Sequence, residues 1–208
     1  MLPAKRLMPK KLYRHRKYAG SPGDVWKHFI FMDFLAKLKN KKLKLIDTHG
    51  GDGFYPLHYG ASWKRGYGLL ETKDIISLKL DKHPYFKYQQ DHFHNKKTYL
   101  GFWALCSELL KDSSDFNLDV YEIQNEVYLD CLKFKDKYQV AKGIEFFNDS
   151  SESADFSKYD IAFIDPTYRR KDEQGDDWSK VIELCRRLEQ ESCEYMLWYP
   201  VYLSLIHI

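Results

Sequence analysis

The sequence IAFIDPTY, residues 161–168, combines a short apolar run with a polar motif, and it predicts both a strand and a binding site. Its apolar half, residues 161–164, predicts a buried parallel strand, and an acid, a proline and an aromatic residue follow it. Open α/β sheets bind ligands at this carboxyl edge. Asp165 and the Pro166 carbonyl offer two acceptors, and the Tyr168 ring offers a face for stacking. We expect them to grip a planar group that carries an amine, although a strand with a proline turn also explains the motif.

Length and composition predict a single domain over residues 1–208. A hydrophobic content of 44% with 30% charged residues is ordinary for a soluble globular protein, and a net charge of +3 says little about partners. Without C-x-x-C spacing we expect reduced thiols and no metal site. No apolar stretch reaches the length of a membrane span, so we expect a cytoplasmic protein. The four cysteines are Cys106, Cys131, Cys185 and Cys193.

The N-terminal residues 1–23 form a basic arm in this interpretation. No acidic residue occurs among the first seventeen. The positive charges of this arm suit contact with phosphates. A solvent-exposed tail explains the same charges equally well. The basic residues are Lys5, Arg6, Lys10, Lys11, Arg14, Arg16 and Lys17.

A helix is expected to follow the arm, with Asp24 as its N-terminal cap. Lys27 lies in its first turns, where a lysine does not offset the helix dipole. Lys27 could bind the carboxylate of a ligand, or its side chain could simply be exposed to solvent. Residues 43–48 then predict the first strand, which runs into a turn containing Gly51 and Gly53. Such a turn lets the backbone approach a nucleotide-like cofactor closely.

Residues 54–97 predict a mostly helical insertion between the first two strands, with no clean strand and with surface histidines at positions 83, 92 and 94. The second strand ends at Glu122, where an acid can accept hydrogen bonds from ribose hydroxyls. Strands that alternate with helices predict an α/β, Rossmann-like parallel sheet. The other expected elements are helices at 99–110, 125–134 and 178–191, strands at 118–123, 138–144 and 195–199, and a polar loop or short helix at 149–157.

With these pieces in order, the chain resembles the class I S-adenosylmethionine-dependent methyltransferases. More closely, it resembles the RlmJ family, bacterial enzymes that methylate adenine N6 in 23S ribosomal RNA. The matching pieces are Tyr13-Arg14-His15, Ala19-Gly20, residues 24–28, residues 45–49 with Gly51 and Gly53, Glu122, residues 164–168 and residues 197–201.

The resemblance implies S-adenosyl-L-methionine as cofactor and protein-free or partly assembled ribosomal RNA as partner. It implies that His28 and His49 contact the cofactor, that Lys27 lies near the cofactor carboxylate and that Glu122 holds the ribose. It makes Asp165 the catalytic residue, with the Pro166 carbonyl as second acceptor. Tyr168 would stack on the target base, and Tyr13 would meet the RNA.

The chain departs from the family pattern at several positions. The family's D-P-P-Y reads D-P-T-Y here, and Phe102 aligns with a serine that touches the cofactor. An Asp-Gly pair expected after the third strand, near the cofactor adenine, aligns with Ile144-Glu145. The sequence stops at Ile208, where the fold normally continues with a helix and two strands. A truncated sequence and a divergent, inactive member are both compatible with this ending.

Two alternatives to ribosomal RNA methylation stay open at this point. DNA adenine methylation uses the same four-residue motif. A non-catalytic RNA-binding relative could have kept the fold and lost the cofactor contacts. Phe102 and Ile144 favour this second alternative, whereas the intact Asp165, Glu122 and His49 oppose it.

Overall fold

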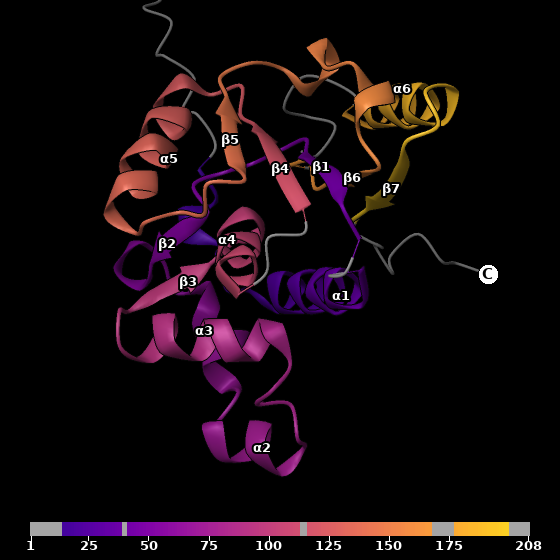
Figure 1. Cartoon of the computed structure of the whole chain (residues 1–208). Helices are drawn as coiled ribbons and strands as arrows, with labels where there is room; N and C mark the ends of the chain where they lie inside the picture. Colours follow the sequence, from indigo (N-terminus) through magenta and orange to yellow (C-terminus); the bar gives the residue numbers. More distant parts are fainter. Residues whose placement is uncertain (1–13, 39–40, 113–115, 168–176, 200–208) are drawn as a thin grey trace, which may run out of the picture.

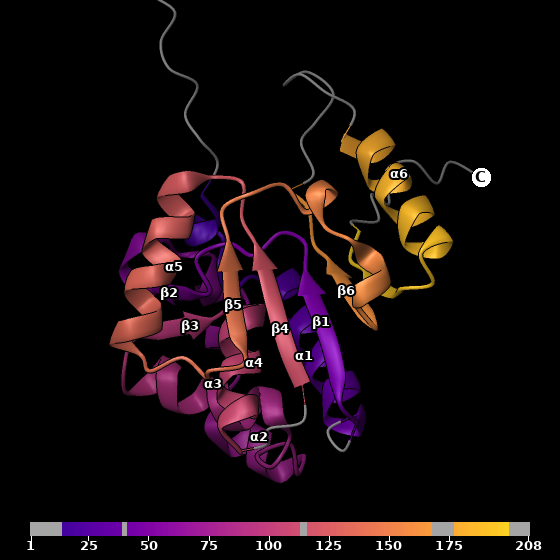
Figure 2. The ribbon, with the colours of Figure 1, turned by 45° about the horizontal axis from the view of Figure 1, so that its top comes forward.

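The central sheet has five strands in the order β5-β4-β1-β6-β7, and all neighbours are parallel (Figures 1 and 2). The structure is a computed structural model that describes residues 14–38, 41–112, 116–167 and 177–199. The predicted α/β, Rossmann-like fold is confirmed. The strands are β1 (Leu43–Asp47), β4 (Phe116–Tyr121), β5 (Ile144–Phe147), β6 (Ile161–Ile164) and β7 (Glu194–Leu197).

Both faces of the sheet are covered, which explains why all four residues of the central strand β6 are apolar and buried. Leu45 and Phe163 pack into a core on one face, whereas Ile46 and Ile164 pack into a second core on the other. Helices α1 (Pro22–Leu38), α4 (Phe102–Asp112) and α5 (Asn125–Lys137) contribute to the first core. Helix α6 (Asp177–Gln190) covers the second, on the side of the sheet opposite α1 and α4 (Figure 1).

Helix α1 begins two residues earlier than the expected cap at Asp24. Pro22 occupies the first turn, where its missing N–H costs nothing. Ser21 Oγ accepts the N–H of Asp24 at 3.3 Å, so Ser21 is the capping side chain and the prediction for Asp24 was wrong. The Asp24 carboxylate is therefore released from capping and points into the protein, where it is 2% exposed.

The segment between β1 and β4 contains helices and one short strand pair. Strand β2 (Phe54–Pro56) pairs antiparallel with β3 (Thr98–Leu100), so the expectation of no strand in this insertion was wrong. The helix expected from residue 99 begins only at Phe102 because β3 precedes it. The helical elements are η2 (Leu57–Tyr59), η3 (Ser62–Arg65), η4 (Tyr67–Leu69), α2 (Thr72–Ser77) and α3 (Pro84–His94).

Large aromatic side chains fill the core of this segment. Trp103, Tyr67 and Tyr99 are fully buried. His92 is buried as well, so its expected surface position was wrong, whereas His94 is exposed.

The third strand lies further along the chain than expected. Helix α5 continues to Lys137, and Gln139 turns the chain with a φ of +50°. The strand itself is β5, so only Ile144 of the expected residues 138–144 belongs to it. The other expected strands differ from the observed ones by no more than two residues at either end. Residues 149–157 contain the short helix η5 (Ser151–Ser153), and η6 (Phe156–Lys158) follows.

Within the described ranges, no helix combines the length and apolarity needed to cross a membrane.

Candidate active site

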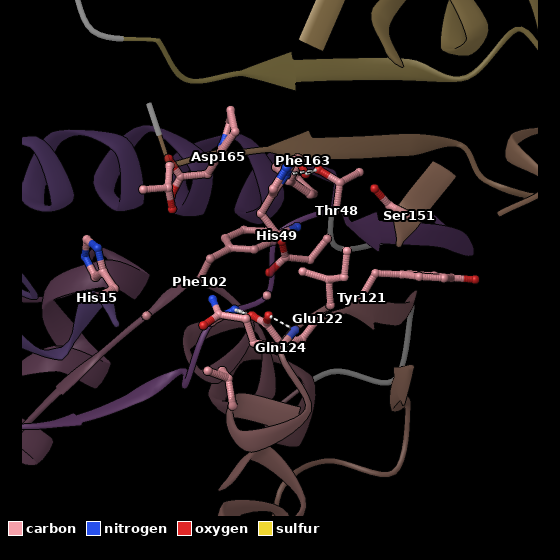
Figure 3. Close-up of a pocket in the computed structure, with 18 of the residues that line it drawn as sticks. His15, Thr48, His49, Phe102, Tyr121, Glu122, Gln124, Ser151, Phe163 and Asp165 are labelled. Carbon is pink, nitrogen blue, oxygen red and sulfur yellow. Dashed lines mark hydrogen bonds between the residues drawn. The ribbon is translucent and has the colours of Figure 1, made fainter. Parts of the chain in front are cut away.

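A pocket of about 470 Å³ opens at the carboxyl ends of the central strands (Figure 3). Each of four neighbouring strands ends next to residues that line it, as expected for an open parallel sheet. These residues are Thr48 and His49 after β1, Glu122 after β4, Asp149 after β5 and Asp165 after β6.

The loop after β1 brings the backbone close to the pocket. Gly51 and Gly53 both have positive φ, +62° and +69°. A side chain on Gly51 would place its Cβ 2.6 Å from Tyr55 Oη, and one on Gly53 would overlap the Trp103 ring. Trp103 Nε1 donates to the Gly51 carbonyl at 3.1 Å, and this hydrogen bond from a buried side chain holds the loop in place. Close contacts with Tyr55 and Trp103 therefore require glycine at both positions, and close approach of this loop to a cofactor stays a prediction.

Glu122 lies directly after β4 and faces this loop. Its Oε2 accepts the N–H of Gly51 at 3.1 Å, and its Oε1 accepts the N–H of Gln124 at 2.7 Å (Figure 3). Burial raises the pKa of Glu122, while these two hydrogen bonds act against the rise. Each oxygen keeps a further lone pair, so the carboxylate can still accept hydroxyl groups. Contact with a ribose stays a prediction.

A chain of charged groups leads from the N-terminal segment to Asp165. His15 Nε2 lies 2.9 Å from Asp24 Oδ2, and Lys27 Nζ lies 2.8 Å from Asp24 Oδ1. The same Nζ lies 2.5 Å from Asp165 Oδ2. Lys27 thus bridges the buried carboxylate of Asp24 and the half-buried carboxylate of Asp165.

The two carboxylates keep Lys27 charged although its side chain is only 7% exposed. Burial alone would lower the pKa of Lys27, but Asp24 and Asp165 raise it above its ordinary value. Burial likewise works to raise the pKa of Asp24, and the opposite charges on His15 and Lys27 bring it well below its usual range. The site therefore contains a stable buried cation beside Asp165.

The two histidines assigned to the cofactor both line the pocket but differ in environment. His28 is buried, and its Nδ1 is hydrogen-bonded to Tyr99 Oη at 2.9 Å. Burial and the neighbouring Lys27 lower the pKa of His28 to about 3, so its ring is neutral. His49 is exposed, and its backbone N–H donates to Asp47 Oδ1 at 3.1 Å. Cofactor contact by either ring stays a prediction.

Asp47 is a pocket residue to which sequence reasoning gave no role. It ends β1 and is 3% exposed. Burial raises the pKa of Asp47 to about 7, with the nearby Asp165 and Glu122 carboxylates acting in the same direction. The pattern of a strand, an acid and a Gly-rich turn indicated a nucleotide-like cofactor in the sequence, without a separate role for Asp47.

The residues after β5 change the interpretation of one position at which the chain departs from the family pattern. Ile144 and Glu145 begin this strand, at the end away from the pocket, and neither lines it. Asp149 and Ser150 follow the strand and do line the pocket. The Asp149 carboxylate accepts the N–H of Ser150 at 2.7 Å. Placing the strand too early had hidden this pair, and Ile144 gives no evidence of a lost cofactor contact.

Phe102 lies in the pocket wall, as its alignment with a cofactor-contacting serine implied (Figure 3). Its ring centroid lies 4.3 Å from that of Phe163 and 5.4 Å from that of Phe31. Pro166 is buried in the pocket lining next to Asp165. Tyr13 and Tyr168 lie outside the described residues. Among the residues that are described, no group of three or more His, Cys, Asp or Glu side chains could hold a metal ion.

Comparisons with known proteins show which proteins the chain is similar to. No protein-family model matches the sequence. A Haemophilus influenzae protein named ribosomal RNA large subunit methyltransferase J is 28% identical over 205 residues, which cover 92% of this chain and 70% of that protein. The protein of the same name from Escherichia coli is 25% identical over 199 residues, with the same coverage.

A Legionella pneumophila protein of known crystal structure superposes with a TM-score of 0.70 at 25% identity, over 88% of this chain and 70% of that one. Along most of its length, the chain is thus similar to bacterial proteins named ribosomal RNA large subunit methyltransferase J, and it has the Rossmann-like fold of class I methyltransferases.

Proposed function

We propose that this protein uses S-adenosylmethionine to methylate adenine N6 in 23S ribosomal RNA. The names of its relatives support a methyltransferase that acts on ribosomal RNA. The observation that carries the proposal is the convergence of Asp165, Glu122 and the Gly51 loop on one pocket at the carboxyl ends of the parallel strands.

The donor and acceptor set of the pocket fits the proposed cofactor. Glu122 would accept ribose hydroxyls, and Asp149 with Ser150 would meet the adenine edge beside β5. His28, His49 and Lys27 would lie along the methionine part, with Lys27 near its carboxylate. The pocket lining carries more acidic than basic side chains, which suits a ligand with a sulfonium and an ammonium group. Bound S-adenosylmethionine would supply an electrophilic methyl group on a positively charged sulfur.

Asp165 and the Pro166 carbonyl would hold the target amine. The lone pair of this amine is delocalised into the adenine ring, so the amine is a poor nucleophile. Two acceptors for its two N–H bonds localise the lone pair and fix its direction, and orientation of this kind can remove much of a barrier. The base must leave its stack to reach the pocket, and Tyr168 would replace the lost stacking. The nitrogen would bond to the methyl carbon as the bond from that carbon to sulfur breaks, and the methylated amine would then release one proton to water.

Lys27 would hold the Asp165 carboxylate in place for this contact. One oxygen of Asp165 faces Lys27, so the other oxygen is left for the amine. Asp24 in turn would hold Lys27 in position, because Lys27 and Asp24 form a buried ion pair.

The proposal is tested by mixing the purified protein with labelled S-adenosylmethionine and, separately, protein-free ribosomal RNA and duplex DNA. Incorporation into RNA that is lost in Asp165→Ala supports the proposal. Incorporation into DNA alone supports the DNA alternative. RNA binding without any incorporation supports the non-catalytic alternative, which Phe102 still favours because it lines the pocket where the family has a serine that touches the cofactor.

A further inference from the structure

Four side chains from three distant segments form a charged cluster at the rim of the pocket. This Arg–Asp cluster consists of Arg14, Arg16, Asp52 and Asp130. Arg16 holds Asp52 with two hydrogen bonds, from Nε at 2.9 Å and from Nη2 at 2.7 Å. Arg14 Nη2 donates to Asp52 Oδ1 at 2.9 Å. Both Nη2 atoms also donate to Asp130 Oδ2, each at 2.6 Å.

Burial makes this cluster different from a surface ion pair. The Asp52 side chain is 1% exposed and that of Arg16 is 14% exposed. Burial works to raise the pKa of Asp130, but hydrogen bonds from Arg14, Lys133 and Arg16 lower it to about 2. Removing one partner from such a group leaves a carboxylate without compensation, which is strongly unfavourable. The cluster therefore imposes one geometry on the segments that it joins.

The joined segments surround the proposed active site. Asp52 lies between the two positive-φ glycines of the loop after β1, and Asp130 lies on α5. The arginines flank His15 at the start of η1 (His15–Lys17). His15 points the other way, with Nε2 on Asp24 and its ring edge-on to Tyr55 at 5.5 Å. Residues 14–16 are thus held on both sides, and Arg14 and His15 line the pocket.

A basic N-terminal segment invites the interpretation that Arg14 and Arg16 bind phosphates. The geometry opposes it, because their Nη2 donors are directed at two carboxylates. The charges of the two arginines and the two carboxylates balance, and the exposed Lys133 adds one positive charge where it pairs with Asp130. Paired in this way, the arginines contribute little net attraction for a polyanion. Their planar guanidinium groups, each with several donors, instead fix the positions of the two carboxylates relative to residues 14–16.

We propose that Asp52 and Asp130 are positioning residues that fix residues 14–16 as the rim over which the RNA target base enters the pocket. This inference rests on the proposed function for its substrate. General electrostatics predicts the opposite effect, since removing a negative charge near RNA strengthens binding. Whether RNA affinity falls or rises when one of these carboxylates is neutralised therefore distinguishes positioning from simple electrostatic repulsion.

The test compares Asp130→Asn with Asp136→Asn, a matched charge change at an exposed position of the same helix. Asp130 does not line the pocket, so direct cofactor contacts are unaltered. We expect Asp130→Asn to weaken binding of protein-free ribosomal RNA on the order of tenfold, the loss of a charge-assisted hydrogen bond. It should raise KM for RNA with little change in kcat, and leave the S-adenosylmethionine affinity within about twofold of wild type. Asp136→Asn should bind RNA as wild type does or more tightly.

A second variant covers the case in which Asp130→Asn folds poorly. Arg16→Lys keeps the charge and loses the planar fork that holds Asp52, so positioning predicts weaker RNA binding. Tighter RNA binding by Asp130→Asn, or wild-type RNA affinity in both Asp130→Asn and Arg16→Lys, overturns the proposal. Wild-type protein that binds RNA without methylating it contradicts the proposed function and leaves this inference standing. Wild-type protein that binds no RNA overturns both.

Discussion

Lys27 Nζ and Asp165 Oδ2 lie 2.5 Å apart although 138 positions separate them in the chain. This ion pair joins the first turns of α1 to the end of β6, and it places a buried cation beside the carboxylate that we assign to the target amine. Asp24 anchors the lysine from the other side. The proposed catalytic carboxylate is thereby held by a side chain of α1 and not by the described residues of its own loop.

Replacing Lys27 should strongly destabilise the protein. Lys27→Met removes the cation between two carboxylates and leaves Asp24, which is 2% exposed, with His15 as its one ion-pair partner among the described residues. The expected loss in the free energy of unfolding is about 3–5 kcal/mol, measured by urea denaturation. Lys37→Met is the matched control, because Lys37 pairs with Asp33 on the exposed side of the same helix and should cost less than about 1 kcal/mol. Equal, small losses in both variants would show that the buried pair does not hold this region together.

Glu122→Ala should weaken S-adenosylmethionine binding by about 1–3 kcal/mol, because charge-assisted hydrogen bonds to the ribose are lost. Isothermal titration calorimetry gives the affinity. Glu126→Ala changes an exposed acid one turn further along and should leave the affinity as it is in wild type. Unchanged affinity in Glu122→Ala would remove this residue from the site.

The raised pKa of Asp47 predicts a pH-dependent stability. The folded protein holds the Asp47 proton up to about pH 7, whereas the unfolded chain releases it near pH 3.8. Unfolding therefore releases a proton between these values, and stability falls as pH rises through this window. Relative to Asp47→Asn, which mimics the protonated form, wild type should lose up to about 1.4 kcal/mol per pH unit from pH 4 to 7 and no more above it. Chemical denaturation at several pH values measures this difference, and a constant difference would mean that Asp47 is ionised throughout.

Deleting residues 1–11 should weaken RNA binding and flatten its dependence on salt. Four of the seven basic residues of the arm lie in this stretch, and each phosphate contact that they make releases counterions. The slope of log affinity against log salt concentration measures the number of such contacts. An unchanged slope would return this part of the arm to the interpretation as a solvated tail.

Features set by local pattern were predictable from the sequence. Residues 161–164 form a strand because four apolar residues end abruptly at a polar motif, and Asp165 lies at the pocket for the same reason. Glu122 and the Gly51 loop follow from the same rule at other strand ends.

Features set by long-range pairing were not predictable. The bridge from Asp24 through Lys27 to Asp165 joins residues that no spacing rule connects. Asp149 was hidden because the apolar Val140 and Ala141 resemble a strand, whereas they follow the turn at Gln139 and precede β5. Tertiary packing decided between these alternatives.

The most direct test of the central claim measures methyl transfer by wild type, Asp165→Asn and Asp165→Ala, with the product nucleoside identified by mass spectrometry. Because the amine becomes acidic only once it is methylated, an acceptor in the right place matters more than a negative charge. Wild type should therefore yield N6-methyladenosine, Asp165→Asn should retain measurable transfer, and Asp165→Ala should fall by a hundredfold or more, on the order of the loss of a positioned polar partner. All three should still bind the cofactor. Wild-type transfer rates in Asp165→Ala, or a product other than N6-methyladenosine, would contradict the account. An Asn variant as inactive as the Ala variant, with normal cofactor and RNA binding, would mean that Asp165 acts through its charge or as a proton acceptor.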